Sequence, residues 1–145
     1  MNPKTLTVVA AAACLAVAVP VVAHGPGDTA PSGPHETVIP NFERVLPNVP
    51  GKSLVAVEVV FPPGVASRPH RHAKSAFIYG YVVSGTIQSQ VEGEPPRTLK
   101  AGESFYESPG AHHLGTRNTS TTQPAKLLAV FVVDSHDKEL TTPDK

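Results

Sequence analysis

The chain has little of what several protein classes need. It contains no tryptophan and one cysteine, and its 12 Lys+Arg and 12 Asp+Glu residues cancel to zero net charge. Without an excess of basic side chains to neutralise phosphates, we expect no nucleic-acid partner. A single cysteine forms no internal disulfide, so the fold depends on core packing, a metal or association between chains.

Residue patterns that favour helices are also scarce. The 145 residues include 16 prolines and 11 glycines, and each interior proline costs a helix about 3 kcal/mol. The hydrophobic fraction of 40% still suffices for a core, which excludes wholesale disorder. The length is typical of one domain. The composition therefore favours a single domain built from strands and turns.

Residues 1–23 have the pattern of a secretory signal peptide. Lys4 precedes an apolar run over residues 6–19, and small residues follow up to Ala23. The run is too short for a stable membrane span, although a retained anchor and a lipoprotein site at Cys14 are alternatives. We expect cleavage after Ala23, no stable membrane span after processing, and a periplasmic or secreted protein.

The remaining chain divides into three parts. Residues 24–36 are rich in Gly and Pro and are expected to form a flexible leader, whereas residues 136–145 are expected to form a polar tail. Between them, residues 37–135 contain short strand-like runs separated by turn signals roughly every eight to twelve residues. This pattern predicts an all-β sandwich or barrel. Strands are expected at 53–61, 77–84, 86–91 and 126–133, with weaker ones at 37–46, 98–99 and 104–107.

Three histidines in the polar stretches are candidate metal ligands. His70 and His72 are two residues apart, and in an extended segment both side chains point to the same face. His113 follows a Pro-Gly turn on a later segment that a barrel could bring alongside. The same alternation turns the neighbouring His112 outward. Because imidazole binds transition metals, the pattern predicts a metal site formed by the other three.

The residues around these histidines resemble the two sequence motifs of the cupin superfamily. The first motif, Gly-x5-His-x-His, is matched by residues 64–72 and is followed after the next strand by Gly85. The second is matched by residues 102–113, including the Pro-Gly turn, with Asn118 one residue late. The chain is most similar in this respect to small, single-domain, exported cupins of the quercetin-dioxygenase-like kind. The resemblance implies a jelly-roll β-barrel that holds a divalent transition metal (Fe, Zn, Ni, Mn or Cu) through His70, His72 and His113.

The sequence departs from the cupin pattern at two positions. Ser108 replaces a motif proline, and Ile78 stands where the family carries a glutamate ligand. The site is then either a three-histidine site, as in some cupin dioxygenases, or it recruits an acid from elsewhere. Glu107 is the candidate catalytic residue, because it shares a strand face with Phe105 and could bind the metal or act as general base. The alternative is a residue at the rim of the barrel that forms a salt bridge.

Three classes of function agree with these features. The first is an Fe(II)-dependent dioxygenase with a three-histidine site that acts on a small organic substrate. The second is a non-catalytic periplasmic module that binds a small molecule or a metal, and the third is a metal-dependent isomerase or lyase. A homodimer is expected, since small cupins are often dimers and the strand at 53–61 could present an unpaired edge.

Overall fold

The structure, a computed structural model, describes residues 33–145. The predicted signal peptide at 1–23 lies outside the described residues, and so does most of the predicted leader. The described chain contains ten β-strands. None of its residues belongs to a helix long and apolar enough to cross a membrane.

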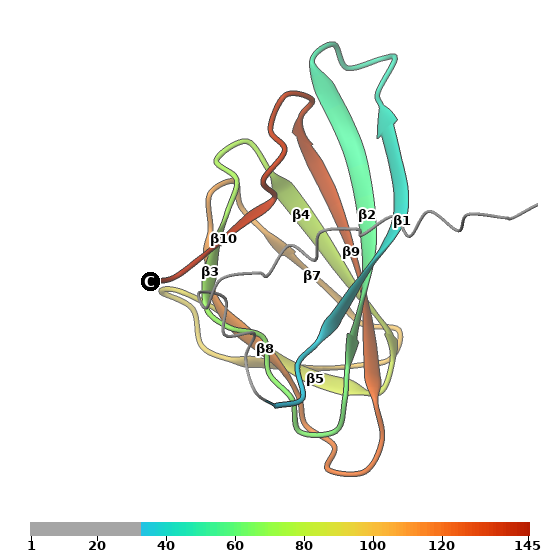
Figure 1. The fold of residues 1–145 in the computed structure, drawn as a ribbon, viewed down its shortest axis with the longest axis vertical. Helices are drawn as coiled ribbons and strands as arrows, with labels where there is room; N and C mark the ends of the chain where they lie inside the picture. Colours follow the sequence, from blue (N-terminus) through green and yellow to red (C-terminus); the bar gives the residue numbers. More distant parts are fainter. Residues whose placement is uncertain (1–32) are drawn as a thin grey trace, which may run out of the picture. The chain divides into compact units, whose positions relative to one another are not determined.

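The strands form two antiparallel sheets of five strands each, which lie as two layers around the interior (Figure 1). The first sheet has the order β1 (Thr37–Val45), β2 (Lys52–Phe61), β9 (Ala125–Asp134), β4 (Phe77–Ser84) and β7 (Ser104–Glu107). The second has the order β10 (Thr141–Pro143), β3 (His70–His72), β8 (His112–Asn118), β5 (Thr86–Val91) and β6 (Arg97–Lys100). The predicted all-β jelly-roll barrel is confirmed.

Alternating burial along the strands explains why these segments form two layers. In β9 every second residue from Ala125 to Val133 is buried, and the intervening ones are half-buried. A tight connection then joins the layers at Gly85, between β4 and β5. Its φ of +79° favours glycine, and a Cβ atom there would lie 2.8 Å from the Cβ of Ala125. The first cupin motif thus ends in a glycine that the close approach of β9 requires.

The core consists of two clusters of buried apolar side chains between the layers. One contains Phe61, Val82, Ile87, Leu99, Phe105, Ala125 and Leu127, and the other contains Ala76, Ile78, Ala129, Phe131 and Val133. Burying a side chain of the size of leucine or phenylalanine stabilises the fold by about 1.5–3 kcal/mol. Members of both clusters also line an internal cavity.

Two segments differ from the sequence-based expectation. Residues 53–61 do not form a sheet edge, because β1 pairs with β2 along its whole length and β2 lies between β1 and β9. Residues 136–145, interpreted as a polar tail, include β10, which pairs with β3 in the register Thr141↔His72 and Pro143↔His70. The C-terminal residues therefore support the strand that carries two of the candidate ligands.

Candidate metal centre

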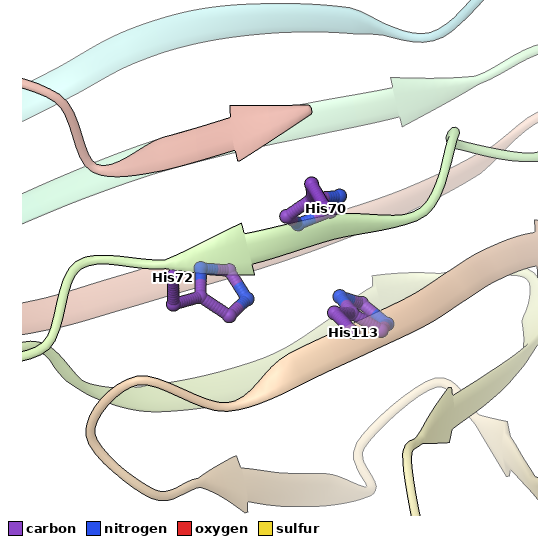
Figure 2. Close-up of side chains that lie close together, drawn as sticks. All are labelled: His70, His72 and His113. Atoms are coloured by element: carbon purple, nitrogen blue, oxygen red, sulfur yellow. The ribbon is translucent and has the colours of Figure 1, made fainter. Parts of the chain in front are cut away.

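The three predicted histidines converge in the interior. β3 and β8 are neighbours in the second sheet, with His70 opposite His113 and His72 two residues further along β3. One potential ligand atom from each side chain lies within 4.8 Å of the other two. Figure 2 shows the three side chains close together, with His70 and His72 on β3 and His113 on the neighbouring β8. His72 and His113 are buried, and His70 is half-buried.

Glu107 reaches the same place from the opposite sheet. Its carboxylate is buried, with one oxygen, Oε2, 3.0 Å from Nε2 of His72 and the other, Oε1, 3.5 Å from Nδ1 of His113. The side chain is only 2% exposed. Glu107 is thus an interior residue and does not lie at the rim of the barrel, and its contacts are with two of the candidate ligands.

The position of Glu107 relates directly to the missing motif glutamate. In the pairing of β4 with β7, Ile78 is the cross-strand partner of Glu107. Directly opposed residues share a face of the sheet and have Cβ atoms about 4.5–5.5 Å apart. The cupin motif places its glutamate at the position of Ile78 on β4. In this chain the carboxylate belongs instead to Glu107, directly across from Ile78 on the neighbouring strand β7.

The donor atoms fit a transition-metal ion. Both ring nitrogens of His72 and Oε2 of Glu107 are buried without a hydrogen bond. Nε2 of His72 and Oε2 of Glu107 are 3.0 Å apart, but their geometry is not that of a hydrogen bond. Each buried polar group without a partner costs about 1–3 kcal/mol. Ligands at right angles on a metal with bonds of about 2.1 Å are about 3.0 Å apart. A cation between the rings would therefore satisfy atoms that the protein leaves unpaired.

Hydrogen bonds orient two of the rings. Nδ1 of His70 donates to the carbonyl oxygen of Arg68 at 2.8 Å, which leaves Nε2 free to coordinate. Nε2 of His113 lies 3.1 Å from the hydroxyls of both Ser89 and Thr116, so its Nδ1 faces Glu107. Metal-binding histidines commonly use their second nitrogen in this way, which fixes the ring and the tautomer.

Sequence reasoning did not identify Ser89 and Thr116. The alternation of β5 turns Ser89 inward, where it is buried, and leaves the neighbouring Gln88 and Gln90 half-buried. A serine between two longer polar residues is the one signal that the sequence carried. Its direction depends on the register between β5 and β8, which local sequence does not specify.

Burial and neighbouring charges set the protonation states of the site. Burial lowers the pKa of His113 to about 4 and also lowers the pKa of His70. Burial alone would raise the pKa of Glu107, but the contact with His72 and the nearby histidines outweigh it, so the pKa of the carboxyl is lowered. At neutral pH, His70 and His113 are neutral and the carboxylate is charged, which are the forms that bind metal.

The cluster borders a cavity of about 480 Å³ between the two sheets. Apolar side chains from the first sheet form most of its walls, among them Val57, Val59, Leu127 and Phe131, whereas the histidines and Glu107 lie along another part of its lining. Exposed residues, including Arg68, Thr141 and Pro143, also line the cavity. A small molecule with an apolar body can therefore lie beside the donor atoms.

Other residues singled out by the motifs have structural contacts. His112 lies outside the cluster and contacts Asp144 at 2.8 Å, which raises the pKa of its imidazole. Asn118 is buried and donates to the carbonyl oxygens of Phe61, Pro62 and Gln123. The backbone carbonyl oxygen of Ser108 accepts a hydrogen bond from the N–H of Ala111 at 3.0 Å, so the turn forms without the motif proline.

Comparison with known families identifies the domain. A family model for the cupin domain matches residues 57–131, which is more than half of the chain. The chain belongs to the cupin family. Together with the three-histidine cluster, this supports a metal-binding cupin, whose metal is a divalent ion.

Solved structures of other proteins resemble this one. The protein TT1209 from Thermus thermophilus is 26% identical, with a TM-score of 0.56 over 68% of this chain and 84% of that chain. An oxalate oxidase in complex with the substrate analogue glycolate is 25% identical, with a TM-score of 0.55 over 72% of this cupin and 53% of that chain. The DMSP lyase DddQ from Ruegeria pomeroyi DSS-3 is 27% identical, with a TM-score of 0.51 over 63% of this cupin and 45% of that chain. This cupin thus spans about half the length of the last two. No match emerges among curated proteins.

Proposed function

We propose that this cupin is a metal-dependent dioxygenase that acts on a small organic substrate inside the barrel. The observation that carries the proposal is the position of the donor cluster, which borders a cavity of about 480 Å³. A site that only sequesters a metal is normally closed by protein ligands, whereas a catalytic site leaves room for a substrate. The cavity supports the second arrangement.

Four side chains are proposed to hold the metal. His70, His72 and His113 supply neutral imidazole nitrogens, and Glu107 supplies a carboxylate in place of the acid missing at Ile78. The lowered pKa of Glu107 favours a ligand over a strong proton acceptor. When bound, the metal, for which we propose iron, supplies Lewis acidity and one-electron redox chemistry.

The chain's other residues bind and position the substrate. The aliphatic and aromatic walls favour a carbon skeleton larger and less polar than glycolate, with its oxygen atoms at the end near the histidines. Phe131, whose ring centroid lies 5.8 Å from that of His72, forms an apolar wall at this end of the cavity. Arg68 is the cationic side chain of the cavity lining and suits a substrate that carries an acidic group.

Oxygen uptake tests this function. The protein is loaded with Fe(II) and assayed with a panel of catechols and flavonols, and His113→Ala is assayed in parallel as a variant that lacks a ligand. The proposal predicts substrate-dependent oxygen consumption by the wild type and its loss in His113→Ala. Bound metal without oxygen consumption for any member of the panel contradicts the dioxygenase and favours the binding module.

A lyase is the second candidate. The resemblance to a DMSP lyase, at 27% identity, supports it, and so does a buried carboxylate beside the substrate cavity. In that case Glu107 would accept a proton from the substrate. Product formation without oxygen consumption distinguishes the lyase from the dioxygenase, and metal retention in Glu107→Ala distinguishes a proton acceptor from a ligand.

Two further features belong to the proposal. The chain is exported after cleavage behind Ala23, which N-terminal sequencing of protein from the native host tests. It also works as a homodimer. A small-molecule substrate is the partner that the interior of the barrel accommodates.

A further inference from the structure

The end of the chain, residues 137–145, forms a strap along β3. Its strand β10 pairs with β3 and with no other described strand, so it is the edge of the second sheet (Figure 1). The register places Thr141 opposite His72 and Pro143 opposite His70. Because directly opposed residues share a face of the sheet, Thr141 and Pro143 lie beside the two candidate ligands.

The strap forms part of the cavity wall and borders its mouth. Leu140, Thr141 and Pro143 all line the cavity. Thr141 and Pro143 are also exposed, so the cavity reaches the solvent beside them. The donor atoms lie deeper, since His72 and Glu107 are only 7% and 3% exposed. A molecule that binds to these atoms must therefore pass a mouth that the strap borders.

Little apolar burial holds the strap in place. None of its residues is buried, and only Asp137 and Leu140 are half-buried. Leu140 packs against the second core cluster, whereas β10 itself is three exposed residues long. In the central strand β9, by contrast, every second residue is buried. Segments with few buried apolar contacts open locally at a lower free energy than core strands do.

The two ends of the strap are attached differently. At its start, Asp137 accepts a part-buried hydrogen bond from Oγ of Ser75 at 2.6 Å, and the same Oγ accepts one from the N–H of Asp134 at 3.0 Å. At its other end, the exposed carboxylate of Asp144 lies 2.8 Å from Nε2 of His112. Exposed ion pairs contribute little to stability. The end at Asp137 is thus the firmer attachment, and the end at Asp144 is the weaker one.

We propose that the strap detaches at Asp144, pivots near Asp137 and so admits small molecules to the cavity. When it opens, Thr141 and Pro143 leave the rim, and the mouth widens directly beside the candidate ligands. β3 keeps its pairing with β8 in the open state, so the candidate ligands stay in place. This inference goes beyond the proposed reaction, because it applies to any ligand that enters the cavity.

A disulfide that locks the strap to β3 provides the test. Arg71 and Thr142 are opposed in the pairing of β3 with β10, and neither lines the cavity. Opposed Cα atoms of antiparallel strands are about 4.5–5.5 Å apart, a distance that a disulfide between two introduced cysteines spans. The control disulfide replaces Gln88 and Thr98, an opposed pair of β5 and β6 that does not line the cavity either. All variants carry Cys14→Ser, which removes the only native cysteine.

A cysteine inside the cavity reports on access. Ala129 lines the cavity and is 8% exposed, so the thiol of Ala129→Cys reacts with N-phenylmaleimide only when the reagent enters. Mass spectrometry of the peptide that contains residue 129 gives the rate, and denatured protein gives the rate for full access. The lock is expected to slow labelling at least about tenfold, and its reduction to restore the rate. The control disulfide is expected to leave the rate unchanged. If Ala129→Cys does not fold, Val59→Cys, which also lines the cavity, takes its place.

Weakening the end at Asp144 is expected to have the opposite effect. Asp144→Ala removes the contact with His112 and is expected to speed labelling about two- to fivefold, as fits the loss of an exposed ion pair. Glu139→Ala is the matched control, because Glu139 is an exposed acid of the strap with no ion pair in the described part of the chain. Its labelling rate is expected to be unchanged.

Three results would overturn the proposal. They are labelling that the lock does not slow, labelling that Asp144→Ala does not speed, and labelling of the folded protein that is absent or as fast as in the denatured protein. Neither metal nor substrate takes part in the assay. Its outcome therefore does not depend on whether the protein is a dioxygenase.

Discussion

Exchanging Ile78 and Glu107 tests whether the acid has moved by one strand. The two residues are direct cross-strand partners on the cavity side of β4 and β7. Glu107→Ile removes a charged group 3.0 Å from His72. Loss of residues that merely support a ligand already weakens metal binding about 10- to 100-fold, so loss of a ligand is expected to cost at least about 100-fold.

The double variant, Glu107→Ile with Ile78→Glu, carries the carboxylate at the position of the cupin motif. Because the two positions share a level and a face, zinc affinity is expected to return to within about tenfold of the wild type. Glu94→Ile is the control, since it removes an exposed carboxylate from the turn after β5. Its zinc affinity is expected to equal that of the wild type.

Stability and affinity are expected to change in opposite directions. In the metal-free protein, Glu107→Ile removes a buried oxygen that lacks a hydrogen bond, which is expected to raise the free energy of unfolding by about 1–3 kcal/mol. Competition with a chelator of known affinity measures zinc binding, and chemical denaturation measures stability. Wild-type zinc affinity in Glu107→Ile would refute the ligand role. A folded double variant that does not recover zinc binding would refute the displacement by one strand.

Three further predictions concern the supports of the site. Burial lowers the pKa of His113 to about 4, below the value of about 6.5 for an unfolded imidazole. The contribution of His113 to metal-free stability is therefore complete above pH 6.5, and about 3 kcal/mol of it is lost as the pH falls toward 4. Chemical denaturation between pH 4 and 6.5 measures how steeply the free energy of unfolding depends on pH, and His113→Asn is expected to reduce this dependence. The same pH dependence in the wild type and the variant would contradict the role given to His113. Ser89→Ala is expected to weaken zinc binding about 10- to 100-fold, whereas Ser89→Thr is expected to preserve it. Calorimetry measures both affinities, and a wild-type zinc affinity in Ser89→Ala would show that Ser89 does not orient His113. A Cβ atom at Gly80 would lie 2.5 Å from the ring of Phe105. Gly80→Ala is therefore expected to lower the free energy of unfolding by about 1–3 kcal/mol. An unchanged denaturation midpoint in this variant would contradict the close approach of Phe105.

Local pattern predicted the features that depend on alternation. The spacing of His70 and His72 placed both on one face of an extended segment, and the structure has them side by side on β3. The alternation that pairs Glu107 with Phe105 likewise turned the acid inward. Period-two reasoning needs only neighbours in sequence, and it held for these strands.

Features that depend on pairing between distant strands could not be predicted. Nothing near Ile78 indicates that Glu107 is its cross-strand partner, and nothing in residues 136–145 indicates pairing with β3. Strand 53–61 was wrongly expected at an edge for the same reason, because the partner that covers it, β1, is a weakly patterned strand. Register and strand order are decided by the packing of the whole barrel, which single segments do not encode.

Metal content of the purified protein tests the central claim most directly. Wild-type protein and the double variant His70→Ala, His72→Ala are purified in parallel and analysed for transition metals, with circular dichroism to verify that both are folded. We expect one divalent ion per wild-type chain and none in the double variant. A folded double variant that retains its metal would contradict the assignment of the site.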